Sequence, residues 1–210
     1  IRNTNRVKNR QPLSLIRIAS SNNDVIEVVS LIPNVSYKDK KYGDIYRWEK
    51  AGEIVEMTEG AKAKSTYKIG DKVCALLGGG GYAEFVSVKF DMCMPVPKNC
   101  TMAEAAAIPE AFATAYLNLF IEGNIKEGDT LLMNAGASGL ASVIIPMAKA
   151  FGIRVITTVL TEEIANNIKH LNADRVVVTT KEDISEVLKE ELEAGNSVDV
   201  AIDCLGGEIM

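Results

Sequence analysis

The stretch Thr130–Ala141 has the sequence TLLMNAGASGLA, and it decides the fold. Residues 130–134 are a short apolar run that predicts a buried strand, and a helix is expected from the end of this stretch to about Phe151. Between them, the turn 135–141 consists almost entirely of small residues. Small residues at such a turn let backbone N–H groups approach a pyrophosphate and let the helix pack closely on the strand. The unpaired N–H groups at the helix N-terminus also favour an anion. The turn therefore predicts dinucleotide binding, with a purely structural turn as the alternative.

Strands and helices alternate after this turn. Their lengths and the short loops between them predict a parallel sheet with right-handed crossovers. The expected strands are 153–159, 175–179 and 198–204, and the expected helices are 161–171 and 181–194.

The preceding residues have a different pattern, typical of a small antiparallel barrel. Turn residues, among them Gly60 and residues 78–81, separate short strands expected at 13–19, 52–57, 72–77 and 82–88. Residues 31–48 show no period and are expected to form a loop, and Pro109 is expected to break the helix formers 102–108 and 111–120 apart. The fold class is therefore α/β with an all-β part. The predicted domains are residues 1–112, all-β, and 113–210, α/β.

Composition excludes several kinds of function. The 210 residues carry a net charge of −5, which argues against a dedicated nucleic-acid binder, and no apolar run is long enough for a membrane span. The four cysteines form no CxxC pair, which favours neither a zinc site nor a disulfide framework and suits a reducing, cytoplasmic setting. The only histidine, His170, is expected on an exposed helix, so mechanisms that need a histidine base or a His-containing metal site are disfavoured.

The end of the second predicted strand does not select a cofactor. An NAD site would place an acid there for the ribose hydroxyls, but residues 157–160 are TTVL. An NADP site would place a cation nearby, but residues 161–164 are TEEI.

Several stretches in this order resemble one known family. They are YKIGDKVCALLGGGGYAEFVSV (67–88), AAAIPEAFATAYLNLF (105–120), EGDTLLMNAGASGL (127–140), KHLNADRVV (169–177) and VDVAIDCLGG (198–207). Together they resemble the zinc-free quinone oxidoreductase (zeta-crystallin-like) branch of the medium-chain dehydrogenase/reductase superfamily. The resemblance implies a GroES-like β-barrel catalytic domain beside a Rossmann domain, with NADPH in the cleft between them. It also implies hydride transfer to a quinone or an activated enone without a metal and without a catalytic nucleophile.

The resemblance also implies cofactor-binding residues. Asn23 and Asp24 match the N-terminal loop that flanks the nicotinamide pocket, and Thr114 matches a threonine near the nicotinamide ring. The pyrophosphate loop supplies Ser138, Gly139 and Leu140. The remaining matches are Thr161 at the 2′-phosphate corner, Thr179 near the adenosine, and Cys204 at the end of the fourth strand.

The chain departs from the family at the 2′-phosphate corner and at its end. Leu160 and Ile164 stand where the family has Gly and Lys, and only Thr161 is retained. The family continues well beyond Gly207, so the chain looks C-terminally incomplete, with the strand 198–204 as an apolar edge. The full-length family commonly forms dimers. Two alternatives follow: a truncated or decayed non-enzymatic paralogue that acts through protein–protein pairing, and an enoyl-thioester reductase on a similar scaffold.

Overall fold

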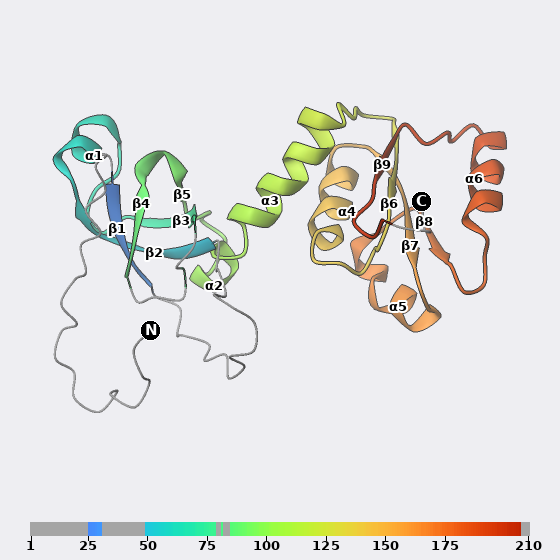
Figure 1. The fold of residues 1–210 in the computed structure, drawn as a ribbon, viewed down its shortest axis with the longest axis horizontal. Helices are drawn as coiled ribbons and strands as arrows, with labels where there is room; N and C mark the ends of the chain where they lie inside the picture. Colours follow the sequence, from blue (N-terminus) through green and yellow to red (C-terminus); the bar gives the residue numbers. More distant parts are fainter. Residues whose placement is uncertain (1–24, 31–48, 79–80, 82–84, 207–210) are drawn as a thin grey trace.

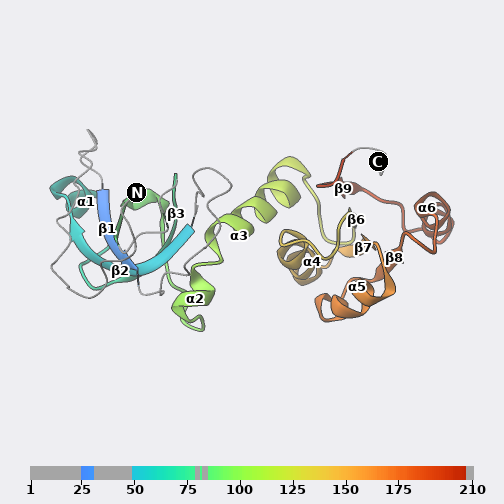
Figure 2. The ribbon, with the colours of Figure 1, turned by 60° about the horizontal axis from the view of Figure 1, so that its bottom comes forward.

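The computed structural model describes residues 25–30, 49–78, 81 and 85–206. They form two sheets, one antiparallel and one parallel, and helix α3 runs from one to the other (Figure 1). The second view shows the same arrangement, with the antiparallel sheet at one end of α3 and the parallel sheet at the other (Figure 2).

The antiparallel sheet has the order β4-β1-β2-β3-β5. Its apolar residues alternate along the strands, so that Ile54, Val73 and Val88 meet in a buried cluster. The strands are β1 (Val25–Ser30), β2 (Glu49–Met57), β3 (Lys72–Leu76), β4 (Phe85–Lys89) and β5 (Cys93–Pro95), with α1 (Glu59–Lys64) after β2 and the turn η2 (Phe90–Met92) before β5.

Two helices follow the antiparallel sheet. Helix α2 (Met102–Ala105) begins with a capping box, in which the Thr101 hydroxyl accepts the N–H of Glu104 and the Glu104 carboxylate accepts the N–H of Thr101. Helix α3 (Pro109–Tyr116) continues into the wider turn η3 (Leu117–Glu122), where the N–H of Gly123 bonds to the carbonyl oxygen of Asn118.

The parallel sheet has the order β8-β7-β6-β9. Its elements are β6 (Thr130–Met133), α4 (Ala141–Ala150), β7 (Arg154–Val159), α5 (Glu162–Asn167), η4 (Lys169–Leu171), β8 (Arg175–Val178), α6 (Ile184–Glu193) and β9 (Val200–Ile202). One face of the sheet packs against α3, α4 and α5, and the other packs against α6. Both faces are covered, which explains why these strands consist mostly of apolar and β-branched residues.

The α/β fold with an all-β part is confirmed. Strands β6, β7, β8 and β9 lie within or close to the predicted ranges, and their parallel pairing is as expected. Expected helices 161–171 and 181–194 correspond to α5 with η4 and to α6. His170 is exposed in η4, where its Nδ1 lies 2.9 Å from the carbonyl oxygen of Asn167. Expected strand 13–19, loop 31–48 and the start of the strand 82–88 lie outside the described residues.

Two local expectations were wrong, and one boundary shifted. Pro109 separates α2 from α3 as expected, but α3 begins at Pro109 itself and not at residue 111, because the missing N–H of proline is harmless in the first turn. Gly60 lies inside α1, whose Thr58 cap accepts the N–H of Ala61 at 3.3 Å. Strand β1 was not predicted, although it pairs with both β2 and β4.

Candidate cofactor site

Gly136 makes the turn after β6 possible. Its N–H donates to the carbonyl oxygen of Thr158 at 2.8 Å, which draws the turn against β7. A Cβ atom at this position would lie 2.4 Å from Oγ1 of Thr157, a fully buried side chain. The close approach of the two backbones therefore requires glycine here.

Ala135, just before it, adopts a left-handed backbone with φ of 57°. This conformation is unfavourable for alanine because its Cβ approaches the following carbonyl oxygen. A hydrogen bond from its N–H to Oγ1 of Thr158, at 3.3 Å, helps to hold the residue in place. The surrounding structure thus imposes strain at the turn, a feature that clusters at binding sites.

The next residues form a cradle of N–H groups at the N-terminus of the ten-residue helix α4. The N–H groups of Ser138 and Ala141 are satisfied within the loop, by the Ala135 carbonyl oxygen and the Ser138 hydroxyl. Among the described residues, no acceptor is found for the N–H groups of Ala137, Gly139 and Leu140.

The space in front of this cradle is open. A Cβ atom built at Gly139 would meet no atom within 4 Å. Ala141, in contrast, is fully buried against the core, where a small residue lets α4 approach the sheet. The donors, the helix N-terminus and the open approach at Gly139 fit the pyrophosphate of a dinucleotide.

A buried amide connects the cradle with the end of β9. Asn134, which directly follows β6, accepts a hydrogen bond from the Thr158 hydroxyl at 3.0 Å and donates to Oδ1 of Asp203 at 3.1 Å. The thiol of Cys204 lies 3.8 Å from the Asn134 carbonyl oxygen. Hydrogen bonds from the N–H of Gly206 and from Asn134 hold the pKa of Asp203 below its usual range, so Asp203 stays ionised.

The carboxyl ends of β7 and β8 form a second polar corner. Thr161 caps α5, with its hydroxyl accepting the N–H of Ile164 at 3.3 Å. Thr179 is exposed, and its hydroxyl donates to the carbonyl oxygen of Val159 at 3.3 Å. Leu160, which directly follows β7, is 61% exposed.

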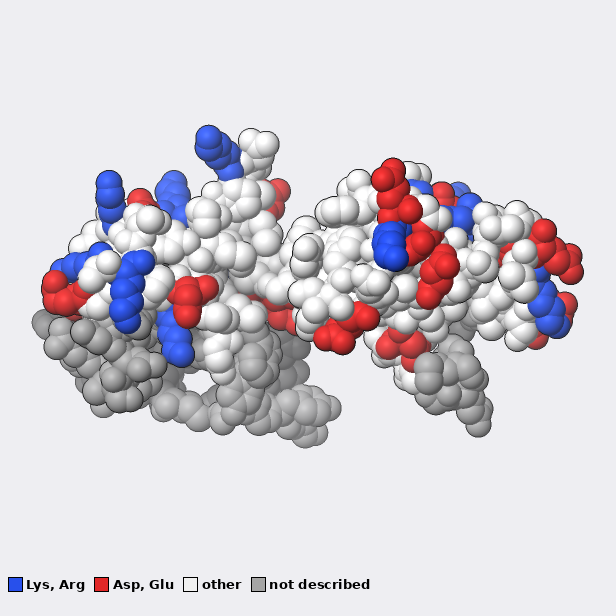
Figure 3. Space-filling model, turned by 90° about the horizontal axis from the view of Figure 1, so that it is seen from above, with Lys and Arg blue, Asp and Glu red and all other residues white. Residues whose placement is uncertain are grey.

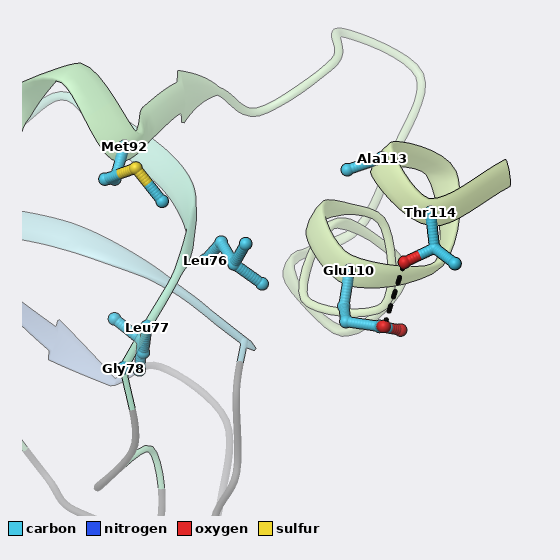
Figure 4. Close-up of a pocket in the computed structure, with 7 residues that line it drawn as sticks. All are labelled: Leu76, Leu77, Gly78, Met92, Glu110, Ala113 and Thr114. Carbon is cyan, nitrogen blue, oxygen red and sulfur yellow. Dashed lines mark hydrogen bonds between the residues drawn. The ribbon is translucent and has the colours of Figure 1, made fainter. Parts of the chain in front are cut away.

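An apolar pocket of about 560 Å³ lies between β3 and α3. Figure 4 shows Glu110, Ala113 and Thr114 on α3. The side chains of Leu76, Leu77 and Met92 lie opposite them. The Thr114 hydroxyl donates to Oε1 of Glu110 at 3.0 Å. The pocket is lined by Leu76, Leu77, Gly78, Met92, Glu110, Ala113 and Thr114.

The buried thiols near this pocket are unreactive. Burial raises the pKa of Cys93 to about 12, with a further contribution from Cys74, and burial also raises the pKa of Cys74. Both thiols therefore remain protonated at neutral pH, and only the thiolate is a nucleophile.

The predicted site residues fall into separate groups. Ser138, Gly139 and Leu140 form the cradle, and the Asn134 contact brings Cys204 beside it. Thr161 and Thr179 share the corner at the ends of β7 and β8, whereas Thr114 lies in the apolar pocket. Asn23 and Asp24 lie outside the described residues.

Sequence reasoning missed Asn134, Asp203 and Glu110. A signal was available for the first two, since each is a polar residue directly after a buried strand and the ends of parallel strands meet at one edge. Glu110 gave no such signal, because its place in the pocket depends on α3 lying beside β3.

Residues 139–210 match the model of a family described as zinc-binding dehydrogenase. In the described part of the chain, no three His, Cys, Asp or Glu residues gather as metal ligands, and no helix has the length and apolar character needed to cross a bilayer.

Two curated relatives illustrate the similarity. The chain is 34% identical over 164 residues to a quinone oxidoreductase-like protein 2 homolog from Nematostella vectensis, covering 77% of this chain and 43% of that protein. It is 30% identical over 171 residues to the lovastatin diketide synthase lovF from Aspergillus terreus, covering 80% of this chain and 7% of that protein. The chain thus spans less than half the length of these relatives.

Solved structures agree with this similarity. The quinone oxidoreductase of Escherichia coli in complex with NADPH has a TM-score of 0.73 and 25% identity, covering 89% of this chain and 59% of that one. The CurK enoyl reductase has a TM-score of 0.68 and 26% identity, covering 77% of this chain and 47% of that one. The fold, the cradle after β6 and these relatives lead to one conclusion: the chain belongs to the quinone oxidoreductase branch of the medium-chain dehydrogenase/reductase superfamily.

Proposed function

We propose that the protein is an NADPH-dependent oxidoreductase that transfers a hydride to a quinone or an activated enone without a metal. The observation that carries the proposal is the cradle at the N-terminus of α4, where three N–H groups have no acceptor among the described residues and the space at Gly139 is open. The NADPH complex of the related quinone oxidoreductase supports the choice of cofactor. A cytoplasmic location and a dimer of the complete protein belong to the same proposal.

The bound cofactor would supply the hydride, so the protein contributes binding, orientation and a dry site. The N–H groups of Gly139 and Leu140 would hold the pyrophosphate, and Cys204 would lie beside the cofactor at the end of β9. Thr114 would contact the nicotinamide ring from α3. Because its hydroxyl donates to Glu110, the oxygen lone pairs of Thr114 are free to accept a hydrogen bond from the carboxamide.

The apolar pocket beside Thr114 would receive the acceptor. Leu76, Leu77 and Met92 supply an apolar wall, and Glu110 is the one charged residue among the described residues that line the pocket. A carboxylate at the mouth repels anions, so the pocket favours an uncharged, flat acceptor such as a quinone.

A second candidate is an enoyl-thioester reductase, favoured by the similarity to the CurK enoyl reductase. Both activities use the same hydride donor and differ in the acceptor. Comparing acceptors therefore separates them.

The test follows NADPH oxidation with a naphthoquinone, its sulfonated analogue and an enoyl thioester of pantetheine. We expect the neutral quinone to be reduced at least tenfold faster than the sulfonated one. In the Glu110→Gln variant, the ratio of these two rates should be smaller. Preferential reduction of the thioester would instead establish the enoyl reductase, and equal rates with both quinones would remove the role given to Glu110.

A further inference from the structure

The corner at the ends of β7 and β8 contains a cation that the sequence pattern did not reveal. In a dinucleotide fold, the adenosine ribose lies at the end of the second strand of the unit, which is β7 here. The residues that follow β7, 160–164, include two acids and no base. A 2′-phosphate bound by these residues alone would meet only negative charge.

Lys181 comes to this corner from the next strand. β7 and β8 pair in parallel, with Val159 opposite Val178. Beyond the strands, the N–H of Thr179 donates to the Val159 carbonyl oxygen at 2.9 Å, and the Thr180 hydroxyl donates to the Leu160 carbonyl oxygen at 2.8 Å. These bonds hold residues 179–181 against the start of α5.

The ammonium of Lys181 forms an ion pair with Glu162. Its Nζ lies 2.9 Å from Oε1 of Glu162, and the two side chains are 61% and 55% exposed. Glu182, the next residue in sequence, is held elsewhere, since its carboxylate accepts from Arg175 and from the N–H of Val178. The partner of Lys181 is therefore Glu162, in the first turn of α5.

We propose that Lys181 determines the preference for NADPH, by exchanging Glu162 for the 2′-phosphate of the adenosine ribose. An exposed ion pair is weak, so releasing Glu162 opposes the exchange only slightly. A phosphate carries more charge than a carboxylate and accepts hydrogen bonds from the ammonium, and the Thr161 hydroxyl, which accepts from Ile164, still has a proton to donate to it. Lys181 thus takes the place of the cation that is missing at Ile164.

The inference rests on the proposed function, because it needs a dinucleotide in the cradle. It is tested by titrating the chain with NADPH and with NADH and following nicotinamide fluorescence. The variants are Lys181→Met, Glu162→Gln and the control Lys189→Met. Lys189 forms a comparable exposed pair with Glu186 on α6, at 2.8 Å with 65% and 68% exposure.

Lys181→Met should weaken NADPH binding about tenfold and leave NADH binding within about twofold, as expected for loss of one exposed charge-assisted hydrogen bond. Glu162→Gln should strengthen NADPH binding severalfold, because it frees the ammonium. In the wild-type protein, the ratio of the affinity for NADPH to the affinity for NADH should fall as the salt concentration is raised. In Lys181→Met this ratio should not change with salt.

Two failures are distinguishable. If the wild-type chain binds neither nucleotide, the proposed function fails and the role of Lys181 fails with it. If the chain binds NADPH but prefers NADH, or if Lys181→Met changes NADPH affinity no more than Lys189→Met does, only the assignment of Lys181 is overturned.

Discussion

Gly136 and Gly139 are three positions apart in one turn, yet their surroundings predict opposite responses to an added methyl group. In Gly136→Ala the new Cβ would lie 2.4 Å from Oγ1 of buried Thr157, so the free energy of unfolding should fall by about 1–3 kcal/mol. In Gly139→Ala the Cβ meets nothing within 4 Å, and stability should change by at most about 0.5 kcal/mol. Urea denaturation measures both. An equal loss of unfolding free energy in Gly136→Ala and Gly139→Ala would contradict the geometry of the turn.

The same residues show what sequence can and cannot predict at this scale. The run of small residues between a strand and a helix was enough to predict the tight turn between β6 and α4. It did not tell which glycine is sterically required, because that depends on Thr157, which lies across the sheet on β7. Lys181 was missed for the same reason: its partner Glu162 is near in space through the pairing of β7 with β8.

Asp174 joins helix α4 to strands β7 and β8. Its carboxylate accepts hydrogen bonds from Lys149 Nζ at 2.7 and 2.8 Å and from the N–H of Val155 at 2.7 Å. Burial acts to raise the pKa of Asp174, but these hydrogen bonds and the charge of Lys149 outweigh it and lower the pKa. A lowered pKa in the folded state means stabilisation that is present at neutral pH and is lost as the carboxyl protonates in acid.

We therefore expect Asp174→Asn to lower the free energy of unfolding by about 1–2 kcal/mol at neutral pH. The difference from wild type should shrink as the pH falls below about 4. Urea denaturation across this pH range measures it, with Glu186→Gln on the exposed face of α6 as a control that changes little at any pH. If the difference in unfolding free energy between the variant and the wild type stays constant into acid, the charge of Asp174 is not what stabilises its contacts with Lys149 and Val155.

Among the elements, the strands and helices of the parallel sheet were predictable, including α5 with its Thr161 cap, whereas α1 and β1 were not. The strands around the dinucleotide turn are buried on both faces, so their signal is strong. Pro109 was correctly predicted to separate two helices, but the second helix was expected from residue 111, although proline fits the first position of a helix. Helix α1 depends on the Thr58 cap and has one buried residue, Ala61, which is too little for a periodic pattern.

Across the whole molecule, buried residues of the two sheets gather in separate clusters, and this predicts separate unfolding. Ile54 lies at 0% exposure in the cluster of the antiparallel sheet, and Ile144 lies at 0% exposure in that of the parallel sheet. Ile54→Ala should destabilise its own sheet by about 2–5 kcal/mol. Hydrogen exchange should then quicken in β2–β5 and stay slow in β6–β8, and Ile144→Ala should do the reverse. If both variants instead lose protection from hydrogen exchange in both sheets, the two sheets unfold as one cooperative unit.

This experiment also tests the proposed domains, 1–112 and 113–210, whose boundary falls inside α3. That helix has two buried residues, Pro109 at its start and Ala115, which packs in the core of the parallel sheet, while Phe112, Tyr116 and Leu117 are at least 44% exposed. Charged side chains are sparse over the middle of the face shown in Figure 3, where α3 crosses between the sheets. We expect protection in α3 to follow the parallel sheet.

The central claim is that the cradle of N–H groups before α4 binds the pyrophosphate of a nicotinamide dinucleotide. The most direct measurement is a fluorescence titration of the chain with NADPH, comparing the wild type with Gly139→Asp and with Gly139→Asn as the uncharged control of equal size. The account predicts saturable binding by the wild type, a partial loss in Gly139→Asn and no detectable binding in Gly139→Asp, with unchanged melting temperatures because a Cβ at this position meets no atom. Absence of binding by the wild type, or equal affinity in all three proteins, would contradict it.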